Sequence, residues 1–300
     1  MRTLVSGTNG LLGSVVVETL LGQGFDVVGG YHSEPPQFDI PLHEVDITDS
    51  ERVATLVSDY EVDTVVNCAA FTDVDGCETN SELANEVNGV APGAIAEVCA
   101  ERDIDFVHYS TDYVFAGDSD ERYVEDGENG PVQEYGASKL TGEESVRNAD
   151  SDALILRLSF VYGARGDTGE LTGFPQWVAS TLAAGDEVPL FTDQQFTPSR
   201  AGHVAETTRS LLEADATGTF HVTSRSCVTP YEFGEEICNL TGGDDALIES
   251  SSMSDLNRKA ARPQNSCLDV SKVEEELGRP QPTLADDLVA IEGSFSDYMS

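Results

Sequence analysis

Basic residues are scarce in this chain, and lysine is the scarcer of the two main types. Of 300 residues, 16 are Lys or Arg and 55 are Asp or Glu, which gives a formal net charge of −39. The lysines are Lys139, Lys259 and Lys272. Phosphate backbones and anionic lipid headgroups repel a chain this negative. We therefore expect neither nucleic acid nor a membrane surface among its partners.

Metal-binding and membrane-spanning patterns are also lacking. The six cysteines form no C-x-x-C pair, and no Cys/His cluster has zinc spacing. No run approaches the roughly 20 apolar residues of a membrane span, and Gly7, Asn9 and Gly10 interrupt the first apolar stretch, so no signal segment is expected. These absences predict a cytoplasmic protein with reduced thiols and no assignable metal ligand.

The overall composition is that of an ordinary globular protein. Hydrophobic residues make up 39% and charged residues 24%, so the chain can bury a sizeable core as one large domain or two smaller ones. The acids are spread along the whole sequence. This spread is typical of a protein from a high-salt cytoplasm, where ions screen self-repulsion. We assign the acidic surface no chemistry.

Short apolar runs alternate with helical periodicity over the first 160 residues. Strands are predicted at residues 3–6, 25–28, 64–67, 105–110 and 153–158, and helices at 11–21, 50–60, 81–102 and 135–148, with Pro92 breaking or bending the third helix. This alternation predicts an α/β fold, a Rossmann-type doubly wound parallel sheet.

The pattern changes in the second half of the chain. A loop is predicted at 163–173, helices at 176–184 and 201–213, and strands at 187–191 and 218–222. We expect a dinucleotide-binding Rossmann domain at 1–160 and a smaller substrate-binding cap at 161–300. Residues 201–222 are expected to return to the Rossmann sheet.

A glycine-rich turn follows the first predicted strand. In G-x-x-G-x-x-G, Gly7 permits a sharp turn, Gly10 lets the backbone approach a pyrophosphate, and Gly13 lets the helix pack on the strand. The helix N-terminus then offers free N–H groups to phosphates. The dinucleotide contacts predicted here are Gly7, Asn9, Gly10, Leu11, Leu12 and Gly13.

The end of the second strand favours NADP(H) and leaves NAD(H) open. An NAD site usually has an acid here for the ribose 2′-hydroxyl, but the first acid is Glu34. Asp46 and Ile47 are predicted to flank the adenine, and the alternative for Asp46 is a helix-start residue before Thr48. The other candidate contacts are Tyr31, His32 and Ser33.

Tyr135 and Lys139 stand four residues apart, on one face of a predicted helix. A nearby ammonium and a cationic nicotinamide would lower the pKa of the phenol from ~10. Tyr135 could then exchange a proton with a hydroxyl while hydride moves to or from the cofactor. Thr111, at the end of a strand, could hydrogen-bond the substrate carbonyl beside Tyr135.

Several motifs together resemble the extended short-chain dehydrogenase/reductase family and, within it, the dTDP-4-dehydrorhamnose reductases. They are residues 7–13 (GTNGLLG), 67–70 (NCAA), 72–78 (TDVDGCE), 110–115 (STDYVF), 135–139 (YGASK), 193–198 (DQQFTP) and 262–266 (RPQNS). The resemblance implies reduction of the 4-keto group of a nucleotide-linked 6-deoxysugar, with Thr111, Tyr135 and Lys139 as the catalytic trio.

The resemblance also implies binding residues. Ala69 and Ala70 join the cofactor contacts. Arg262 is the candidate for the diphosphate, and its alternative is a surface ion pair. Relatives in this family often carry Trp where this chain has Phe160. The implied substrate contacts are Thr72, Val74, Ser110, Asp112, Tyr113, Phe160, Gln194 and Arg262. Family members can form homodimers around magnesium, for which no ligand is assignable here.

Other activities were weighed against this one. Sugar dehydratases of the superfamily carry Thr-Asp-Glu, whereas Thr111 and Asp112 are followed here by Tyr113, which argues against dehydration. Nucleotide-sugar epimerases also use Tyr-x-x-x-Lys, so epimerisation stays open. A non-catalytic NADP-binding subunit, similar to the beta subunit of methionine adenosyltransferase, is the alternative from a different class.

Overall fold

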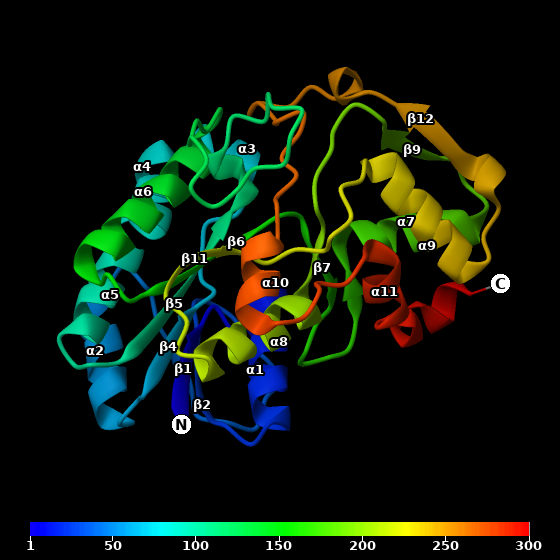
Figure 1. Cartoon of the computed structure of the whole chain (residues 1–300). Helices are drawn as coiled ribbons and strands as arrows, with labels where there is room; N and C mark the ends of the chain where they lie inside the picture. Colours follow the sequence, from blue (N-terminus) through cyan, green and yellow to red (C-terminus); the bar gives the residue numbers. More distant parts are fainter. Residues whose placement is uncertain (300) are drawn as a thin grey trace.

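The computed structural model describes residues 1–299, and a seven-stranded parallel sheet forms its centre (Figure 1). The strands lie in the order β11-β6-β5-β4-β1-β2-β3, and each neighbouring pair is parallel. The chain order reverses between β1 and β4, where ligands bind in such sheets. The strands are β1 Arg2–Ser6, β2 Asp26–Tyr31, β3 Leu42–Glu44, β4 Thr64–Asn67, β5 Asp105–Thr111, β6 Leu154–Leu158 and β11 Gly218–His221.

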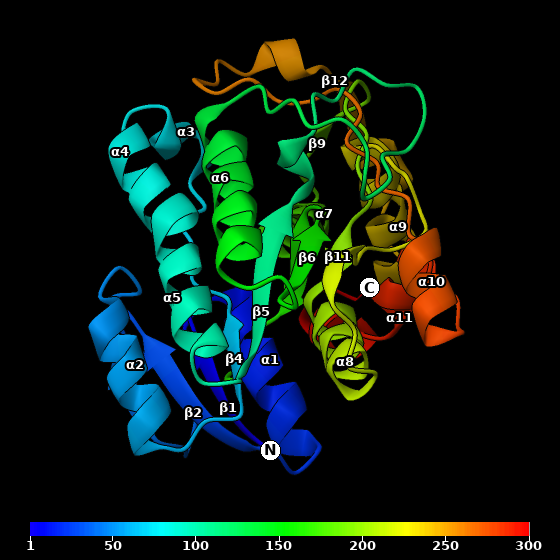
Figure 2. The ribbon, with the colours of Figure 1, turned by 60° about the vertical axis from the view of Figure 1, so that its left-hand side comes forward.

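Helices cover both faces of this sheet (Figure 2). On one face α1 (Leu11–Gly22), α8 (Ala201–Glu213) and α10 (Ser271–Leu277) share a core with the sheet. On the other face α2 (Ser50–Asp59), α5 (Ala91–Ala100) and α6 (Glu134–Ala149) share a second core. Two apolar faces explain the uninterrupted apolar runs of the central strands. The predicted Rossmann-type fold is confirmed.

The helix predicted at 81–102 is present over residues 81–100, but Pro92 does not break it and a π-helical segment interrupts the α-helical pattern. The structure has α3 (Val74–Cys77), α4 (Ser81–Ala84), a π-helical segment (Asn85–Val90) and then α5, with Pro92 in its first turn. Proline lacks an N–H, which the first turn of a helix does not need. The π segment buries Asn88, whose amide bonds the backbone of Phe71 and the Ser138 hydroxyl.

The second half of the chain builds a smaller cap. It contains a three-stranded sheet in the order β10-β7-β8 and a two-stranded sheet of β9 and β12. The strands are β7 Val161–Ala164, β8 Leu171–Thr172, β9 Val188–Phe191, β10 Ser199–Arg200 and β12 Ile248–Ser251. The helices are α7 Gly173–Ala184, α9 Pro230–Thr241 and α11 Leu284–Val289, and they bury a third core of their own.

The loop predicted at 163–173 is partly wrong, because β7 and β8 pair antiparallel across it. These strands are too short to show periodicity, and β7 is fixed by its second partner, β10. Within 201–222, α8 and β11 lie in the Rossmann part. The domain boundary near residue 160 stays a prediction.

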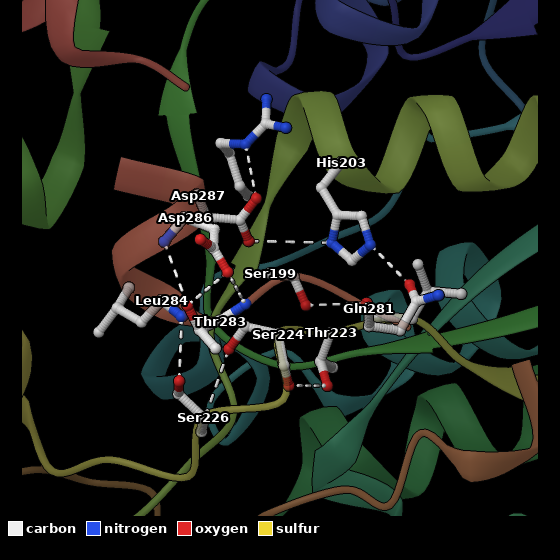
Figure 3. Close-up of polar contacts among 12 residues, drawn as sticks. Ser199, His203, Thr223, Ser224, Ser226, Gln281, Thr283, Leu284, Asp286 and Asp287 are labelled. Atoms are coloured by element: carbon white, nitrogen blue, oxygen red, sulfur yellow. Dashed lines mark hydrogen bonds and ion pairs between the residues drawn. The ribbon is translucent and has the colours of Figure 1, made fainter. Parts of the chain in front are cut away.

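A buried polar cluster joins the C-terminal helix α11 to α8 (Figure 3). Arg200 Nε donates to Asp287 Oδ1 at 2.8 Å, and His203 Nε2 lies 2.6 Å from Gln281 Oε1. Thr283 caps α11. The cluster links the cap to the helix layer of the Rossmann part. No helix among residues 1–299 is both long and apolar enough to cross a membrane.

Candidate active site

A cavity of about 540 Å³ opens at the carboxyl ends of the central strands. It brings together most of the residues predicted from sequence, from β1, β4, β5, α6 and the loop after β6. The predicted residues that line it are Gly7, Asn9, Gly10, Leu11, Leu12, Gly13, His32, Ala69, Ala70, Thr72, Val74, Ser110, Thr111, Asp112, Tyr113, Tyr135, Lys139, Phe160 and Gln194. The cavity is also lined by Asn67, Cys68, Phe196 and Ser266, which lie in the motifs of the resemblance without an individual role, and by Tyr109, Leu158, Ser159 and Val161.

The glycine turn has the geometry that a close-approaching phosphate needs. Gly7 has φ +70°, and a Cβ there would lie 2.7 Å from Ala69 N. A Cβ on Gly13 would lie 2.1 Å from Gly7 O. Gly10 caps α1 without a side-chain hydrogen bond, so the first N–H groups of that helix are left for a ligand.

A loop of the cap supports this turn from outside. Arg165 Nη1 donates to Asn9 O at 2.9 Å, and Gly166 N donates to Ser14 Oγ at 3.1 Å. Arg165 is itself held by Asp167. No local sequence pattern predicts this support, because the β7–β8 connection lies about 150 residues away from the turn.

Of the residues predicted to contact the adenosine part of the cofactor, only some line the cavity. His32 lines the cavity, whereas Ser33 is exposed and Ile47 is buried in the core behind the sheet. Asp46 Oδ1 accepts hydrogen bonds from Thr48 N and Oγ1, which also lower the pKa of this carboxyl. Asp46 therefore stabilises the turn before α2, whose N-cap is Asp49. Tyr31, in β2, is half-buried and does not line the cavity.

The predicted catalytic trio meets in the cavity. Thr111 ends β5, and its Oγ1 accepts from Tyr113 N and donates to Asp112 Oδ1. Tyr135 and Lys139 lie in the first two turns of α6. The Gln133 side chain accepts a hydrogen bond from Gly136 N and so caps the start of α6. A helix that begins here presents both Tyr135 and Lys139 to the cavity.

The pKa of Tyr135 is raised, opposite to the direction predicted from the Tyr-x-x-x-Lys pattern. Burial is the largest cause and the nearby Asp112 carboxylate is the second, while a hydrogen bond with Thr111 opposes them. Desolvation and the Asp112 charge therefore outweigh the hydrogen bond with Thr111. A phenol that keeps its proton is suited to donate it.

Asp112 and Lys139 are buried titratable groups beside this phenol. Burial raises the pKa of Asp112 to about 6, against hydrogen bonds from Ser159, Ser266 and Thr111. Burial lowers the pKa of Lys139 to about 8, against the charge of Glu143. Clustered, shifted pKa values in a cleft are typical of sites that move protons.

A second cavity, of about 490 Å³, adjoins the first and shares Tyr113, Phe160, Gln194 and Phe196 with it. Its walls are largely aromatic. Phe160 has φ +43°, a strained conformation for a bulky residue, and its ring stacks on Phe196 with centroids 4.6 Å apart.

Two arginines line the second cavity. Arg262 Nη2 lies 3.1 Å from Asp75 Oδ2, so the ion pair weighed as its alternative role is present while its side chain still borders the cavity. Arg258, which sequence reasoning missed, lies over the Phe191 ring at 4.9 Å. Arg258 and Arg262 together bring positive charge to an otherwise acidic protein.

The prediction that all thiols are reduced is wrong in this structure. Cys227 and Cys267 form a disulfide, with Cα atoms 5.6 Å apart, between the loop after β11 and the segment that follows Arg262. A pair 40 residues apart has no signature in sequence. Among residues 1–299 no group of three or more His, Cys, Asp or Glu side chains is placed to hold a metal ion.

The chain matches known proteins along nearly its whole length. The model of the RmlD substrate binding domain family matches residues 1–293. A probable low-salt glycan biosynthesis reductase, Agl14 of Haloferax volcanii, is 67% identical over 300 residues, 100% of both chains. The dTDP-4-dehydrorhamnose reductase of Mycolicibacterium smegmatis is 30% identical, covering 99% of this chain and 88% of that one.

Solved structures agree. A dTDP-4-dehydrorhamnose reductase from Bacillus anthracis, in complex with NADP, superimposes with a TM-score of 0.86 at 25% identity, over 97% of this chain and 98% of that one. A hypothetical dTDP-4-dehydrorhamnose reductase from Sulfolobus tokodaii has a TM-score of 0.82 at 32% identity, over 94% and 97%. This chain therefore belongs to the RmlD substrate-binding domain family, among the dTDP-4-dehydrorhamnose reductases and their relatives.

Proposed function

We propose that this protein is an NAD(P)H-dependent reductase that converts the 4-keto group of a nucleotide-linked 6-deoxysugar into a hydroxyl. One observation carries the proposal. A single cavity is lined both by the glycine turn and by Thr111, Tyr135 and Lys139. A phosphate-binding turn and a proton donor in one cavity are the parts that a nicotinamide-dependent carbonyl reduction requires.

The cavity fits a dinucleotide on its own geometry. The turn that lines the cavity is folded too tightly for a side chain at Gly7 or Gly13, where a Cβ would meet the backbone of Ala69 or Gly7, and the N-terminus of α1 lines the same space. His32, with no acidic neighbour at 31 or 33, favours NADP(H), and a relative from Bacillus anthracis was solved with NADP. Bound NAD(P)H would supply the hydride that C4 of the sugar accepts.

The side chains then provide the proton and hold the carbonyl. Tyr135 keeps its proton because it is buried beside Asp112, and it would donate this proton to the sugar O4. Thr111, already hydrogen-bonded to Asp112, would orient the same oxygen. Lys139 would hold the cofactor ribose with its ammonium and return a proton to Tyr135.

The second cavity would take the nucleotide. Its aromatic walls suit a base, with Phe160 able to stack although it lacks an indole N–H. Arg258 and Arg262 would neutralise the diphosphate, which a protein of net charge −39 otherwise repels. The shared residues Tyr113 and Gln194 would bring the sugar between the two cavities.

The relatives narrow the substrates to test first. Named relatives reduce dTDP-4-dehydrorhamnose, and the Haloferax volcanii relative is named for glycan biosynthesis. We therefore propose a deoxysugar destined for glycan assembly, with dTDP as the first nucleotide to try. The high-salt cytoplasm, the homodimer and a magnesium ion stay predictions.

A substrate panel tests the proposal. Purified protein in concentrated KCl should oxidise NADPH or NADH only when given a nucleotide 4-keto-6-deoxysugar. Arg262→Gln should raise KM for that sugar about 10- to 100-fold and leave cofactor affinity unchanged, since it removes a charge-assisted contact. Arg209→Gln, on the outer part of α8, is the matched control. Failure of every 4-keto sugar would instead favour a cofactor-binding subunit.

A further inference from the structure

A chain of four buried polar side chains ends at Lys139, and two of its members, Asn67 and Lys139, line the cavity. Ser6 Oγ donates to Asn67 Oδ1 at 2.6 Å, and Asn67 Nδ2 lies 3.2 Å from His108 Nδ1. His108 Nε2 in turn lies 3.4 Å from Lys139 Nζ. Their exposed fractions are 8%, 1%, 0% and 2%, so solvent cannot replace any of these contacts easily. We call Ser6, Asn67, His108 and Lys139 the buried polar chain.

The buried polar chain comes from three neighbouring strands of the central sheet and the helix α6. Ser6 ends β1 and Asn67 ends β4, which pair side by side, and His108 pairs with Asn67 across β4 and β5. The helix α6 brings Lys139 onto His108. Three neighbouring strands and one helix therefore fix all four side chains.

The position of the proton on the His108 imidazole has to suit the protonation state of Lys139. An ammonium has only N–H donors, so His108 Nε2 must then accept, and the ring proton must sit on Nδ1. A neutral amine has a lone pair, so Nε2 can then carry the proton and donate it. A neutral imidazole has one proton to place, and the state of Lys139 decides where it goes.

Asn67 can serve either tautomer of His108. With its nitrogen toward the ring, as in the structure, it donates to Nδ1, and Ser6 donates to its oxygen. With its oxygen toward the ring, it accepts from Nδ1–H, and its nitrogen donates to the Ser6 hydroxyl. The Ser6 hydroxyl can both donate and accept, so every hydrogen bond of the buried polar chain can form with either tautomer of His108.

The charges around this pair keep His108 neutral while Lys139 titrates. Burial and the Lys139 charge hold the pKa of His108 well below its usual value. Lys139 faces Glu143 on α6 and Cys68 after β4, and both oppose the effect of burial on its pKa. Tyr135, one turn earlier on α6, keeps its phenol proton.

We propose that His108 and Asn67 are positioning residues that give Lys139 a hydrogen-bond partner in both of its protonation states. In the proposed reduction, which this role rests on, the Tyr135 proton goes to the sugar oxygen. The phenolate then takes one proton from the Lys139 ammonium, and the amine regains one from water. Because His108 can change its tautomer, Lys139 keeps a hydrogen-bond partner and stays in place through the cycle.

Nuclear magnetic resonance on the unmodified protein tests this directly. With three lysines and five histidines in the chain, ¹³Cε-lysine and ¹⁵N-imidazole spectra are simple, and Lys139→Arg and His108→Gln assign the two resonances. We expect Lys139 to titrate near pH 8. The His108 proton should lie on Nδ1 below that midpoint and on Nε2 above it. One tautomer on both sides of the midpoint would overturn the proposal.

A substitution in Asn67 provides the second test. Asn67→Asp puts an acceptor-only carboxylate against Nδ1, which holds the ring proton there and favours charged Lys139. The Lys139 midpoint should rise by about one to two pH units, and the basic limb of kcat/KM should rise with it. Asn239→Asp, on the cap helix α9, controls for the added charge. An unchanged midpoint in folded Asn67→Asp would contradict the proposal.

These measurements separate this proposal from the proposed function. A tautomer switch without turnover of any 4-keto sugar would refute the reductase and support the role of His108. Turnover without a tautomer switch would refute the role of His108 alone. A structural role for the imidazole predicts lower stability in His108 variants and no movement of the Lys139 midpoint.

Discussion

The ion pair between Arg157 and Glu143 should be the costliest polar contact to break by removing one partner. Arg157, in β6, is 2% exposed, and its Nε and Nη2 donate to both oxygens of Glu143 at 2.8 Å. It also donates to Glu125 O and lies over the Phe115 ring. Arg157→Met keeps the apolar stem but leaves the Glu143 carboxylate, in α6, buried without its main partner.

The expected cost of Arg157→Met is about 3 to 5 kcal/mol in the free energy of unfolding. For a chain of 300 residues, that corresponds to a fall of about 5 to 8 °C in Tm. The double variant Arg157→Met with Glu143→Met removes both charges and should recover most of the loss. Arg147→Met is the matched control, because Arg147 pairs with the same Glu143 from a 40% exposed position and should cost about 0.5 kcal/mol.

Guanidinium unfolding followed by circular dichroism in constant high salt measures all four proteins. A cost of Arg157→Met no larger than that of Arg147→Met would contradict the role of the buried ion pair. A double variant as unstable as the single one would also contradict it, since the loss would then come from packing and not from an unpaired charge.

Three further predictions follow from other parts of the structure. Gly13→Ala should weaken NADP(H) binding about tenfold or more, because the added Cβ meets Gly7 O. Gly22→Ala, in the same helix, places its Cβ in open space and should leave binding unchanged. Equal binding by both variants would contradict the turn geometry. Titration of unfolded, unreduced protein should find four free thiols, because Cys227 and Cys267 are paired; six would contradict the disulfide. The pKa of Asp287 is raised to about 6 and that of His203 lowered to about 4, both by burial, so their effects on stability oppose each other between pH 4 and 6. Asp287→Asn should therefore lose stability as pH falls from 6.5 to 4, and His203→Gln as pH rises from 4 to 6; matching slopes in calorimetry would contradict this.

The sequence predicted the Rossmann half well because its signals are local. Strands buried on both faces read as short apolar runs, and the glycine turn needs small residues wherever it occurs. The seven-residue segment from Gly7 to Gly13 and the four-residue step from Tyr135 to Lys139 each lie within one turn or helix. Such local patterns can be recognised in a single sequence.

The site features that sequence analysis did not predict depend on contacts between distant segments. Arg258 lines the second cavity because β9 and the segment after β12 meet there. His108 looks like one more residue of a buried strand until α6 brings Lys139 onto it. The raised pKa of Tyr135 follows from burial and from Asp112, which no spacing rule contains.

The central claim is that Tyr135 donates the proton in a nicotinamide-dependent reduction. Tyr135→Phe removes one oxygen and leaves the glycine turn untouched, so NADPH should bind within about twofold of the unmodified protein. Turnover of the nucleotide 4-keto-6-deoxysugar should fall about 10²- to 10⁴-fold, the usual worth of a general acid. Tyr231→Phe, in the cap helix α9, should turn over normally. Equal turnover by Tyr135→Phe and the unmodified protein would contradict the account.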